Sequence, residues 1–383
     1  LLLYTSAAIL AGVNWAGYTP STATWHLRKA MAAASIGNLD TAKTRYNLAL
    51  SGGADPATVW NNLGTIALRE GRSAQAEDLF SRALSANSRH VFAACNLVLL
   101  KAGGGDVDKA LQLCRQAVDY HPRNPWAWVT GGRIAMDAGR FHLAVEWLSR
   151  AAELQPEHAG IAYDLSRAYY LTGDLENALV WGRRAAERLP GRAAPLNNLG
   201  WIMMLAGQTE EGETLLREAL RVDPGFETAR INLAESCLSR GNTEGALRSL
   251  QMGFNPDQAS PAWWYTLGRI REAGGDLSAA EQAYRQALTL RPDFAEALNN
   301  LGMLAAQQQQ SREAETLFRR AIEADPNLPQ PRYNLGRLLC AEGRDAEGQE
   351  VLESLQTLLG PEHPEIDTVR TALQECKSQA GAS

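Results

Sequence analysis

Asparagine recurs along the chain at positions separated by multiples of 34 residues. These residues are Asn62, Asn96, Asn198, Asn232, Asn300 and Asn334. An amide side chain both donates and accepts hydrogen bonds. A row of such amides could bind the backbone of an extended peptide, whatever side chains that peptide carries. Our hypothesis is this binding role, and the alternative is that the amides bond locally within the protein.

Aromatic and arginine side chains occur at other positions of the same 34-residue spacing. They are Trp126, Arg133, Tyr163, Arg167, Trp201 and Arg269. Tryptophan, tyrosine and arginine are the residue types most often found at binding hot spots. The segment 125–226 combines them most densely, so the sequence predicts the centre of a binding surface there. Its aromatic side chains would hold apolar groups of a partner, and its arginines would pair with acidic groups.

Residue patterns typical of enzymes do not occur in this sequence. The six histidines form no metal-binding pair such as H-E-x-x-H. The sequence has no phosphate-binding G-x-x-x-x-G-K-[ST] motif, and no lysine follows a serine by three residues. We therefore predict a protein that is not an enzyme, without a metal ion, cofactor or small-molecule substrate.

A gapless repeat of 34 residues positions the asparagines, aromatics and arginines. It begins at Ala23 and gives ten windows, each with two helical patterns separated by a turn. In the second window Trp60, Leu63 and Ala67 fall on one helical face. The fifteenth position is glycine in nine windows and Gln309 in the other. Glycine tolerates the left-handed conformation that ends many helices. A fixed period of this size indicates stacked helix–turn–helix units.

The second window shows the family that these repeats resemble. It reads Trp60-Asn-Asn-Leu-Gly64, then Ala76 and Phe80 four residues later, and proline closes six of the windows. This order resembles the tetratricopeptide repeat signature, W-x-x-L-G-x-x-Y followed by A-x-x-x-F and P. The resemblance covers residues 23–362. It implies an all-α fold, a right-handed superhelix of ten helix–turn–helix repeats.

The same resemblance implies where the asparagines lie and what they do. The first helix of each repeat would line a concave surface, and the asparagines would form a ladder along it. That ladder is similar to the one in the repeat arm of O-GlcNAc transferase, which holds extended polypeptide. We therefore predict a non-catalytic scaffold whose partner is a protein or an extended peptide segment. The alternatives are a substrate-recruiting arm for a separate enzyme, such as a glycosyltransferase, and a permanent structural subunit of a membrane complex.

The final segment, 363–383, lies outside the repeats and is amphipathic. Ile366, Val369, Leu373 and Cys376 fall on one helical face, which predicts a helix capping the last repeat. The five cysteines are widely spaced, with no C-x-x-C pair, and we interpret them as small apolar core residues, a disulfide being the alternative. The net charge of −6 argues against a nucleic-acid surface, which needs a basic stripe.

The first 22 residues also precede the repeats, and no charged residue occurs before Arg28. As a helix, Leu1 to Tyr18 would be about 27 Å long, close to the thickness of the bilayer hydrocarbon. Trp15 and Tyr18 stand where aromatic belts form. We therefore predict an N-terminal hydrophobic helix, residues 1–22, that anchors the protein in a membrane, as at a bacterial inner membrane. A buried helix packed on the first repeat and a signal-peptide remnant are the alternatives.

Overall fold

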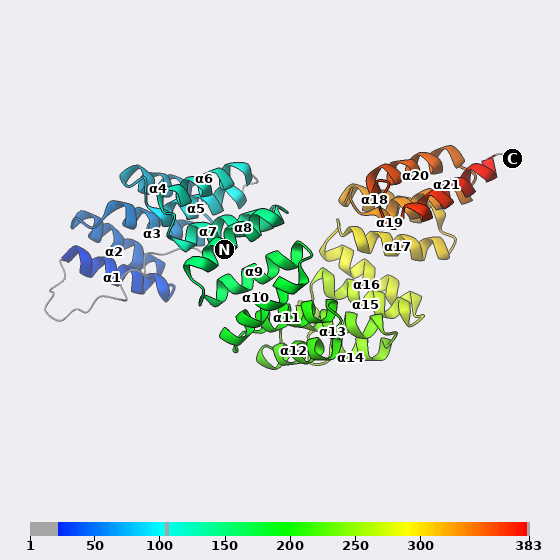
Figure 1. Cartoon of the computed structure of the whole chain (residues 1–383), viewed down its shortest axis with the longest axis horizontal. Coiled ribbons are helices and arrows are strands. Elements are labelled where there is room, and N and C mark those ends of the chain that lie inside the picture. The colour runs from blue at the N-terminus through cyan, green and yellow to red at the C-terminus, as the bar shows by residue number, and fades with distance from the viewer. Residues whose placement is uncertain (1–21, 104–106, 381–383) are drawn as a thin grey trace. The chain divides into compact units, whose positions relative to one another are not determined.

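The computed structural model describes residues 22–103 and 107–380 of the chain. Within these residues the protein is entirely helical, with 21 α-helices, one short 3-10 helix and no strand. The helices form two compact units that meet in the sequence between Pro190 and Gly191. Figure 1 shows consecutive helices lying side by side within each unit. The predicted all-α repeat fold is confirmed.

The N-terminal unit contains five helix pairs. Their bounds are α1 (Thr22–Ser35) with α2 (Leu39–Ser51), α3 (Pro56–Arg69) with α4 (Ser73–Ala86), α5 (Val91–Gly103) with α6 (Val107–Tyr120), α7 (Pro125–Asp137) with α8 (Phe141–Leu154), and α9 (Ala159–Leu171) with α10 (Leu175–Arg188). Each pair corresponds to one 34-residue window of the sequence.

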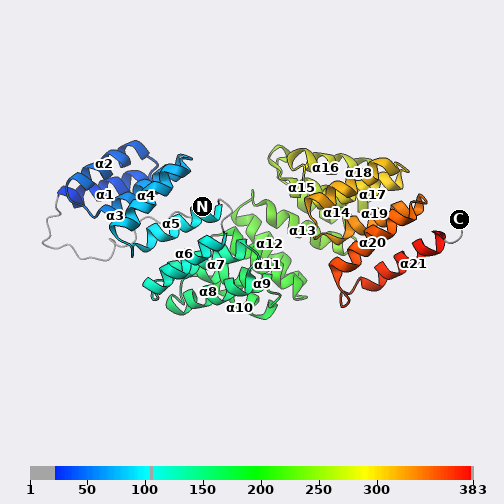
Figure 2. The same cartoon turned by 90° about the horizontal axis from the view of Figure 1, so that it is seen from above.

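The C-terminal unit contains five more pairs, a 3-10 helix and a last helix. Their bounds are α11 (Ala193–Leu205) with α12 (Thr209–Val222), α13 (Glu227–Ser239) with α14 (Thr243–Gln251), η2 (Pro256–Gln258), α15 (Pro261–Ala273) with α16 (Leu277–Leu290), α17 (Ala295–Gln307) with α18 (Ser311–Ala324), α19 (Pro329–Ala341) with α20 (Asp345–Leu359), and α21 (Ile366–Ala380). Figure 2 shows the last helix, α21, beside α20.

The turn inside each pair depends on the residue at position fifteen. Gly275, which follows α15, has a backbone φ of +80°. Gln309 fills the same position after α17 with a φ of +60°, and it is the one non-glycine residue with a positive φ among the described residues. A side chain is strained in this left-handed region, whereas glycine is not. Glycine therefore recurs at position fifteen because the backbone there adopts a positive φ.

Close contact inside most pairs depends on a small residue in the first helix. In the α17–α18 pair, a Cβ atom added to Gly302 would lie 2.7 Å from Cε1 of Phe318. Phe318 is fully buried, so its ring packs directly against the backbone of α17. Since a single repeat cannot enclose such a core, neighbouring repeats complete it. One core cluster of the C-terminal unit, for example, joins residues of α16, α17, α18 and α19.

One repeat departs from the common pattern, at the window 227–260. Its second helix, α14, has only 9 residues, whereas the other second helices have 13 to 15. Gly253 follows it with a φ of +70°, and η2 then leads the chain into α15. Trp263 fills the core beside the shortened helix. It is 1% exposed, and its ring stacks with that of Phe254, with 5.8 Å between the ring centres. In the sequence, Gly253 marks this change, and so does Pro256, which comes two residues before the position of the closing proline in other windows.

The predicted membrane location is wrong. Among residues 22–103 and 107–380, no helix has both the length and the apolar character that a membrane crossing requires. A crossing takes about 20 mainly apolar residues, and the α-helices described here have 9 to 15. The predicted anchor lies outside the described residues, apart from Thr22, which begins α1.

Two of the five cysteines interpreted as apolar core residues are buried but form a disulfide, which was the alternative interpretation. Cys340 in α19 and Cys376 in α21 form a disulfide, with 5.5 Å between their Cα atoms. Cys95, Cys114 and Cys237 are free. Burial raises the pKa of Cys95 to about 11, so this thiol is inert at neutral pH. The sequence could not show the pairing, because 36 residues separate the two cysteines and only folding brings them together.

Candidate functional site

The ladder asparagines connect neighbouring repeats. In three places the Nδ2 of a ladder asparagine donates to the Oδ1 of the first asparagine of a preceding N-N-L-G motif. These bonds run from Asn96 to Asn61 at 2.9 Å, from Asn232 to Asn197 at 2.9 Å, and from Asn334 to Asn299 at 2.8 Å. Local bonding, the alternative role, therefore occurs at these three positions. Sequence reasoning missed the acceptors, although the doubled asparagine of the motif was their signal.

The accessibility of the ladder differs between the two units. In the N-terminal unit Asn62 is 1% exposed and Asn96 is 0% exposed. In the C-terminal unit all four ladder asparagines are half-buried. These are Asn198, Asn232, Asn300 and Asn334. Only a side chain that reaches solvent can exchange water for a peptide, so the C-terminal part of the ladder suits peptide binding better.

Two of the predicted arginines are held by acidic side chains of a neighbouring repeat. Nε of Arg133 donates to Oδ2 of Asp164 at 2.6 Å, and Nη1 of Arg269 lies 2.6 Å from both carboxylate oxygens of Glu235. Asp164 is 4% exposed, and burial raises the pKa of its carboxyl group, against the effect of Arg133. These two ion pairs link successive repeats, a role that the sequence analysis did not anticipate.

A tyrosine and an arginine four residues later recur on three first helices. The guanidinium carbons of Arg167, Arg269 and Arg337 lie 5.8, 5.9 and 5.8 Å from the ring centres of Tyr163, Tyr265 and Tyr333, respectively. Such cation–π contacts contribute about 0.5–1 kcal/mol at exposed sites. Each pair places a guanidinium beside a flat aromatic ring, and in the Tyr265–Arg269 pair Glu235 balances the positive charge.

The predicted tryptophans have different surroundings. Trp126 in α7 is half-buried, and its ring meets that of His158 edge-on at 5.1 Å. Trp201 in α11 is half-buried as well. Trp147 in α8, by contrast, is 3% exposed and packs over Gly131, so it fills the core. Trp181 remains half-buried, with the Arg184 guanidinium 4.5 Å from its ring centre.

The predicted centre of the surface, 125–226, includes residues of both units. Trp126, Arg133, Tyr163 and Arg167 belong to the N-terminal unit, and Trp201 to the C-terminal unit. Asn198, Asn232, Arg269, Asn300 and Asn334 also belong to the C-terminal unit. Within that unit, two of the predicted residues come together around one cavity.

This C-terminal cavity has a volume of about 410 Å³. Its walls come from α17, α19, α20, α21 and the residue just before α21. The lining residues are Asn299, Asn300, Met303, Pro329, Gln330, Tyr333, Asn334, Leu355, Glu365, Thr368 and Val369. Ligand pockets commonly combine an apolar lining with a few polar groups that fix orientation. This cavity has that composition.

The polar groups of the C-terminal cavity are partly engaged. Asn300 accepts from Asn299 at 3.2 Å and donates to the Tyr284 hydroxyl at 3.2 Å. Asn334 donates to Asn299, but its Oδ1 accepts no hydrogen bond from any described residue. That oxygen can therefore accept a hydrogen bond from a backbone N–H of a bound peptide. The apolar side of the cavity, with Met303, Leu355 and Val369, suits an apolar side chain.

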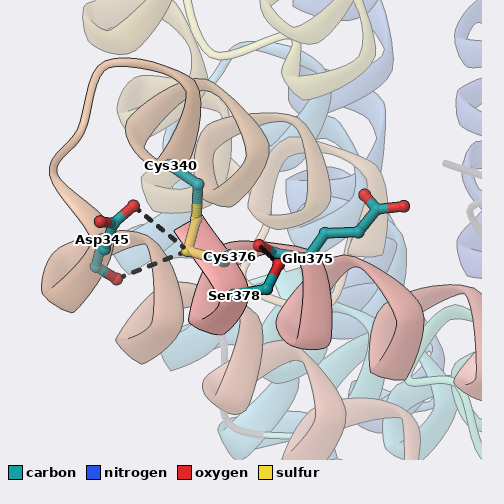
Figure 3. Close-up of a disulfide and its surroundings, with 5 residues drawn as sticks. All are labelled: Cys340, Asp345, Glu375, Cys376 and Ser378. Carbon is teal, nitrogen blue, oxygen red and sulfur yellow. Dashed lines mark hydrogen bonds between the residues drawn. A yellow bond between two sulfur atoms is a disulfide. The ribbon is translucent and has the colours of Figure 1, made fainter. Parts of the chain in front are cut away.

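One group of residues has the spacing of a metal site. Ligand atoms of Cys340, Asp345 and Cys376 lie within 4.8 Å of one another, and no other such group occurs in the described residues. The two sulfur atoms are bonded to each other, as Figure 3 shows, so neither is a thiolate. Thiolate is the form of cysteine that binds metals, and the closed disulfide therefore does not offer this site to a metal ion.

Two tetratricopeptide repeat family models match the chain in alternation. One matches residues 27–91, 129–193 and 265–329, and the other matches residues 101–155, 203–270 and 305–373. The first model alone covers just over half of the chain, and the two together cover most of it.

Two curated relatives share shorter segments. Tetratricopeptide repeat protein 8 of Caenorhabditis elegans is 33% identical over 87 residues, which are 22% of this chain and 17% of that protein. The TPR repeat-containing protein PA0015 of Pseudomonas aeruginosa is 39% identical over 59 residues, which are 15% of this chain and 56% of that protein. The chain thus matches less than two thirds of the length of either relative.

A solved structure resembles the chain over nearly its whole length. It is the crystal structure of the APC/C hetero-tetramer Cut9–Hcn1, with a TM-score of 0.54, 14% sequence identity, and coverage of 92% of this chain and 76% of that chain. At this identity the likeness concerns the fold alone. With the family models matching along the chain and the helix pairs following the 34-residue period, the chain belongs to the tetratricopeptide repeat family, whose members are protein–protein interaction scaffolds.

Proposed function

We propose that this protein is a non-catalytic scaffold that binds an extended polypeptide segment on the first helices of its C-terminal unit. The observation that carries the proposal is the C-terminal cavity, where half-buried ladder asparagines adjoin an apolar lining. A bulky apolar side chain of the segment enters the cavity beside Met303 and Val369. The Oδ1 of Asn334 accepts a hydrogen bond from the backbone of the segment.

The energetics favour a side-chain anchor supported by backbone bonds. Burying a Leu, Ile or Phe side chain contributes about 1.5–3 kcal/mol, whereas one neutral hydrogen bond contributes about 0.5–1.5 kcal/mol. The cavity should therefore determine which peptides bind, and the amides should determine the register of the backbone. Asn198, Trp201, Asn232 and Arg269 extend the proposed surface along the preceding first helices of the same unit.

The test starts from peptides selected against the full chain out of a random library displayed on phage. Thr368 is exposed and lines the cavity, so Thr368→Trp fills the cavity without changing the core. Gln374→Trp adds the same ring to an exposed position of α21 outside the cavity and serves as the control. We expect Thr368→Trp to raise the Kd of the selected peptides at least ten-fold, and Gln374→Trp to leave it unchanged.

Fluorescence anisotropy of labelled peptides measures these constants. Circular dichroism first confirms that both variants remain helical. Peptides that bind the Thr368→Trp variant as tightly as the original protein would show that the cavity is not the binding site. The predicted centre at 125–226 would then be tested with Trp201→Ala and with the pair Asn198→Ala and Asn232→Ala.

A further inference from the structure

Helix α21 forms one wall of the C-terminal cavity. Thr368 and Val369 line the cavity from its first turn, and Glu365 lines it from the residue just before the helix. The opposite wall includes Tyr333 and Asn334 of α19. The cavity therefore keeps its shape only while α21 stays against α19 and α20.

Besides an exposed ion pair between Lys377 of α21 and Glu353 of α20, two interactions hold α21 in place. The first is a narrow apolar stripe packed against α19 and α20. Its buried members are Ile366, Val369, Ala372, Leu373 and Cys376. The rest of the helix, between residues 366 and 378, is exposed. A helix that buries so few apolar side chains is among the elements that separate most easily from the rest of a protein.

The second interaction is the disulfide between Cys340 of α19 and Cys376 of α21 (Figure 3). Cys376 lies toward the C-terminal end of α21, while residues 360–365 connect the other end to α20. The helix is thus fixed covalently at both ends, and the cavity-lining residues Thr368 and Val369 lie between the two attachments. A disulfide that closes a long loop strongly restricts the states available once packing is lost.

We propose that the Cys340–Cys376 disulfide makes α21 a redox-controlled wall of the C-terminal cavity. With the bond closed, α21 completes the cavity and the protein binds its peptide. With the bond reduced, α21 separates from α19 and the binding site loses one wall. This inference rests on the proposed function, because it concerns the regulation of that same site.

The redox step needs a dithiol as reductant. One thiolate of the dithiol attacks a sulfur of the protein disulfide and breaks the S–S bond, which forms a mixed disulfide and releases the other cysteine as a thiolate. The second thiolate of the dithiol then displaces the first cysteine and closes the reductant's own disulfide. Two electrons pass to the protein, and each cysteine takes up one proton.

Hydrogen exchange measured by mass spectrometry tests the movement of α21 without any ligand. The full chain is compared before and after treatment with dithiothreitol. We expect the amides of 366–377 to exchange at least ten-fold faster after reduction, while those of α17 stay unchanged. Fluorescence of the dye 8-anilinonaphthalene-1-sulfonate should rise at the same time, because Leu352 and Leu355 lose the cover of α21.

Two variants serve as controls. The double variant Cys340→Ser and Cys376→Ser should exchange like the reduced protein and should not respond to dithiothreitol. Cys237→Ser removes a free, half-buried thiol and should behave like the original protein in both states. These controls separate the effect of the disulfide from any other effect of the reductant.

Binding of the library-selected peptides completes the test. We expect their Kd to rise at least ten-fold on reduction. If α21 exchanges equally slowly in both redox states, or if the Kd does not change on reduction, the redox control is refuted while the proposed function stands. If the oxidised protein binds no peptide, the proposed function fails, and the exchange rates still show whether the disulfide holds the helix.

Discussion

The Nδ2 of Asn334 in α19 donates a hydrogen bond to the Oδ1 of Asn299 in α17 over 2.8 Å, and 35 residues separate the two in sequence. The separation is one repeat plus one residue, so the bond joins the sixth position of one repeat to the fifth of the repeat before. Asn96 and Asn232 make equivalent bonds to Asn61 and Asn197. One amide of the ladder can therefore link repeats through its nitrogen and still offer its oxygen to a peptide.

Removing the acceptor of this bond should weaken the stack. Asn299 is 5% exposed, so Asn299→Ala leaves the Nδ2 of Asn334 without its acceptor in a partly buried place. We expect a loss of about 1–2 kcal/mol in the free energy of unfolding. Urea denaturation followed by circular dichroism measures it. Asn327→Ala, at an exposed loop position, is the control and should change stability by less than about 0.5 kcal/mol.

Placing glycine at the one turn that lacks it should stabilise the protein. Gln309 adopts a φ of +60°, which strains a side chain. Gln309→Gly removes this strain, but glycine loses more conformational entropy on folding. We therefore expect a net increase of about 0.5–1 kcal/mol in the free energy of unfolding. The reverse change at the equivalent turn, Gly275→Gln, should cost about 1 kcal/mol. The strain would be contradicted if Gln309→Gly failed to raise the free energy of unfolding in urea, or if Gly275→Gln failed to lower it.

Adding one methyl group to the interface of a helix pair should destabilise it. The Cβ of Gly302→Ala would lie 2.7 Å from the ring of Phe318, which is fully buried and cannot move away freely. We expect a cost of about 1–3 kcal/mol.

A second substitution in the same pair tests the cause of that cost. In the window 227–260, Ala234 and Leu250 stand at the positions of Gly302 and Phe318, and both belong to one core cluster. The double variant Gly302→Ala and Phe318→Leu should therefore lose less stability than the sum of the two single variants. Additive losses would show that the contact between the two residues is not the cause.

Acidification below neutral pH should destabilise the N-terminal unit through His90. Its Nδ1 accepts a hydrogen bond from the backbone nitrogen of Ala93 at 3.1 Å, at the start of α5. Burial lowers the pKa of His90 from its ordinary value of 6.5, although Asp55 opposes this shift; His121 adds to it. The folded state thus resists protonation. The stability that depends on neutral His90 is complete above pH 6.5 and is lost as the pH falls from 6.5 toward the folded-state pKa.

Replacement of His90 by a residue that does not titrate tests this pH dependence. His90→Asn keeps a side-chain acceptor at the N-cap. Urea midpoints measured between pH 7.5 and pH 5 should fall less steeply for this variant than for the original protein. Parallel curves for the two proteins would mean that His90 does not contribute to the pH dependence.

The sequence by itself determined the repeat architecture. The 34-residue period, the turn glycines at the fifteenth position and the small residues such as Gly302 follow from local backbone and packing requirements that every repeat shares. Because the same requirement recurs ten times, the pattern is visible without coordinates, and the helix pairs follow it. The residues of the ladder were visible for the same reason.

Only the tertiary structure decided what those residues contact. The ladder bonds depend on two helices 35 residues apart, the pairing of Arg133 with Asp164 joins neighbouring repeats, and the disulfide joins α19 to α21. The C-terminal cavity likewise needs walls from four helices. Such features arise from contacts between elements that are remote in sequence, and the repeat pattern alone does not fix which side chains of adjacent repeats meet.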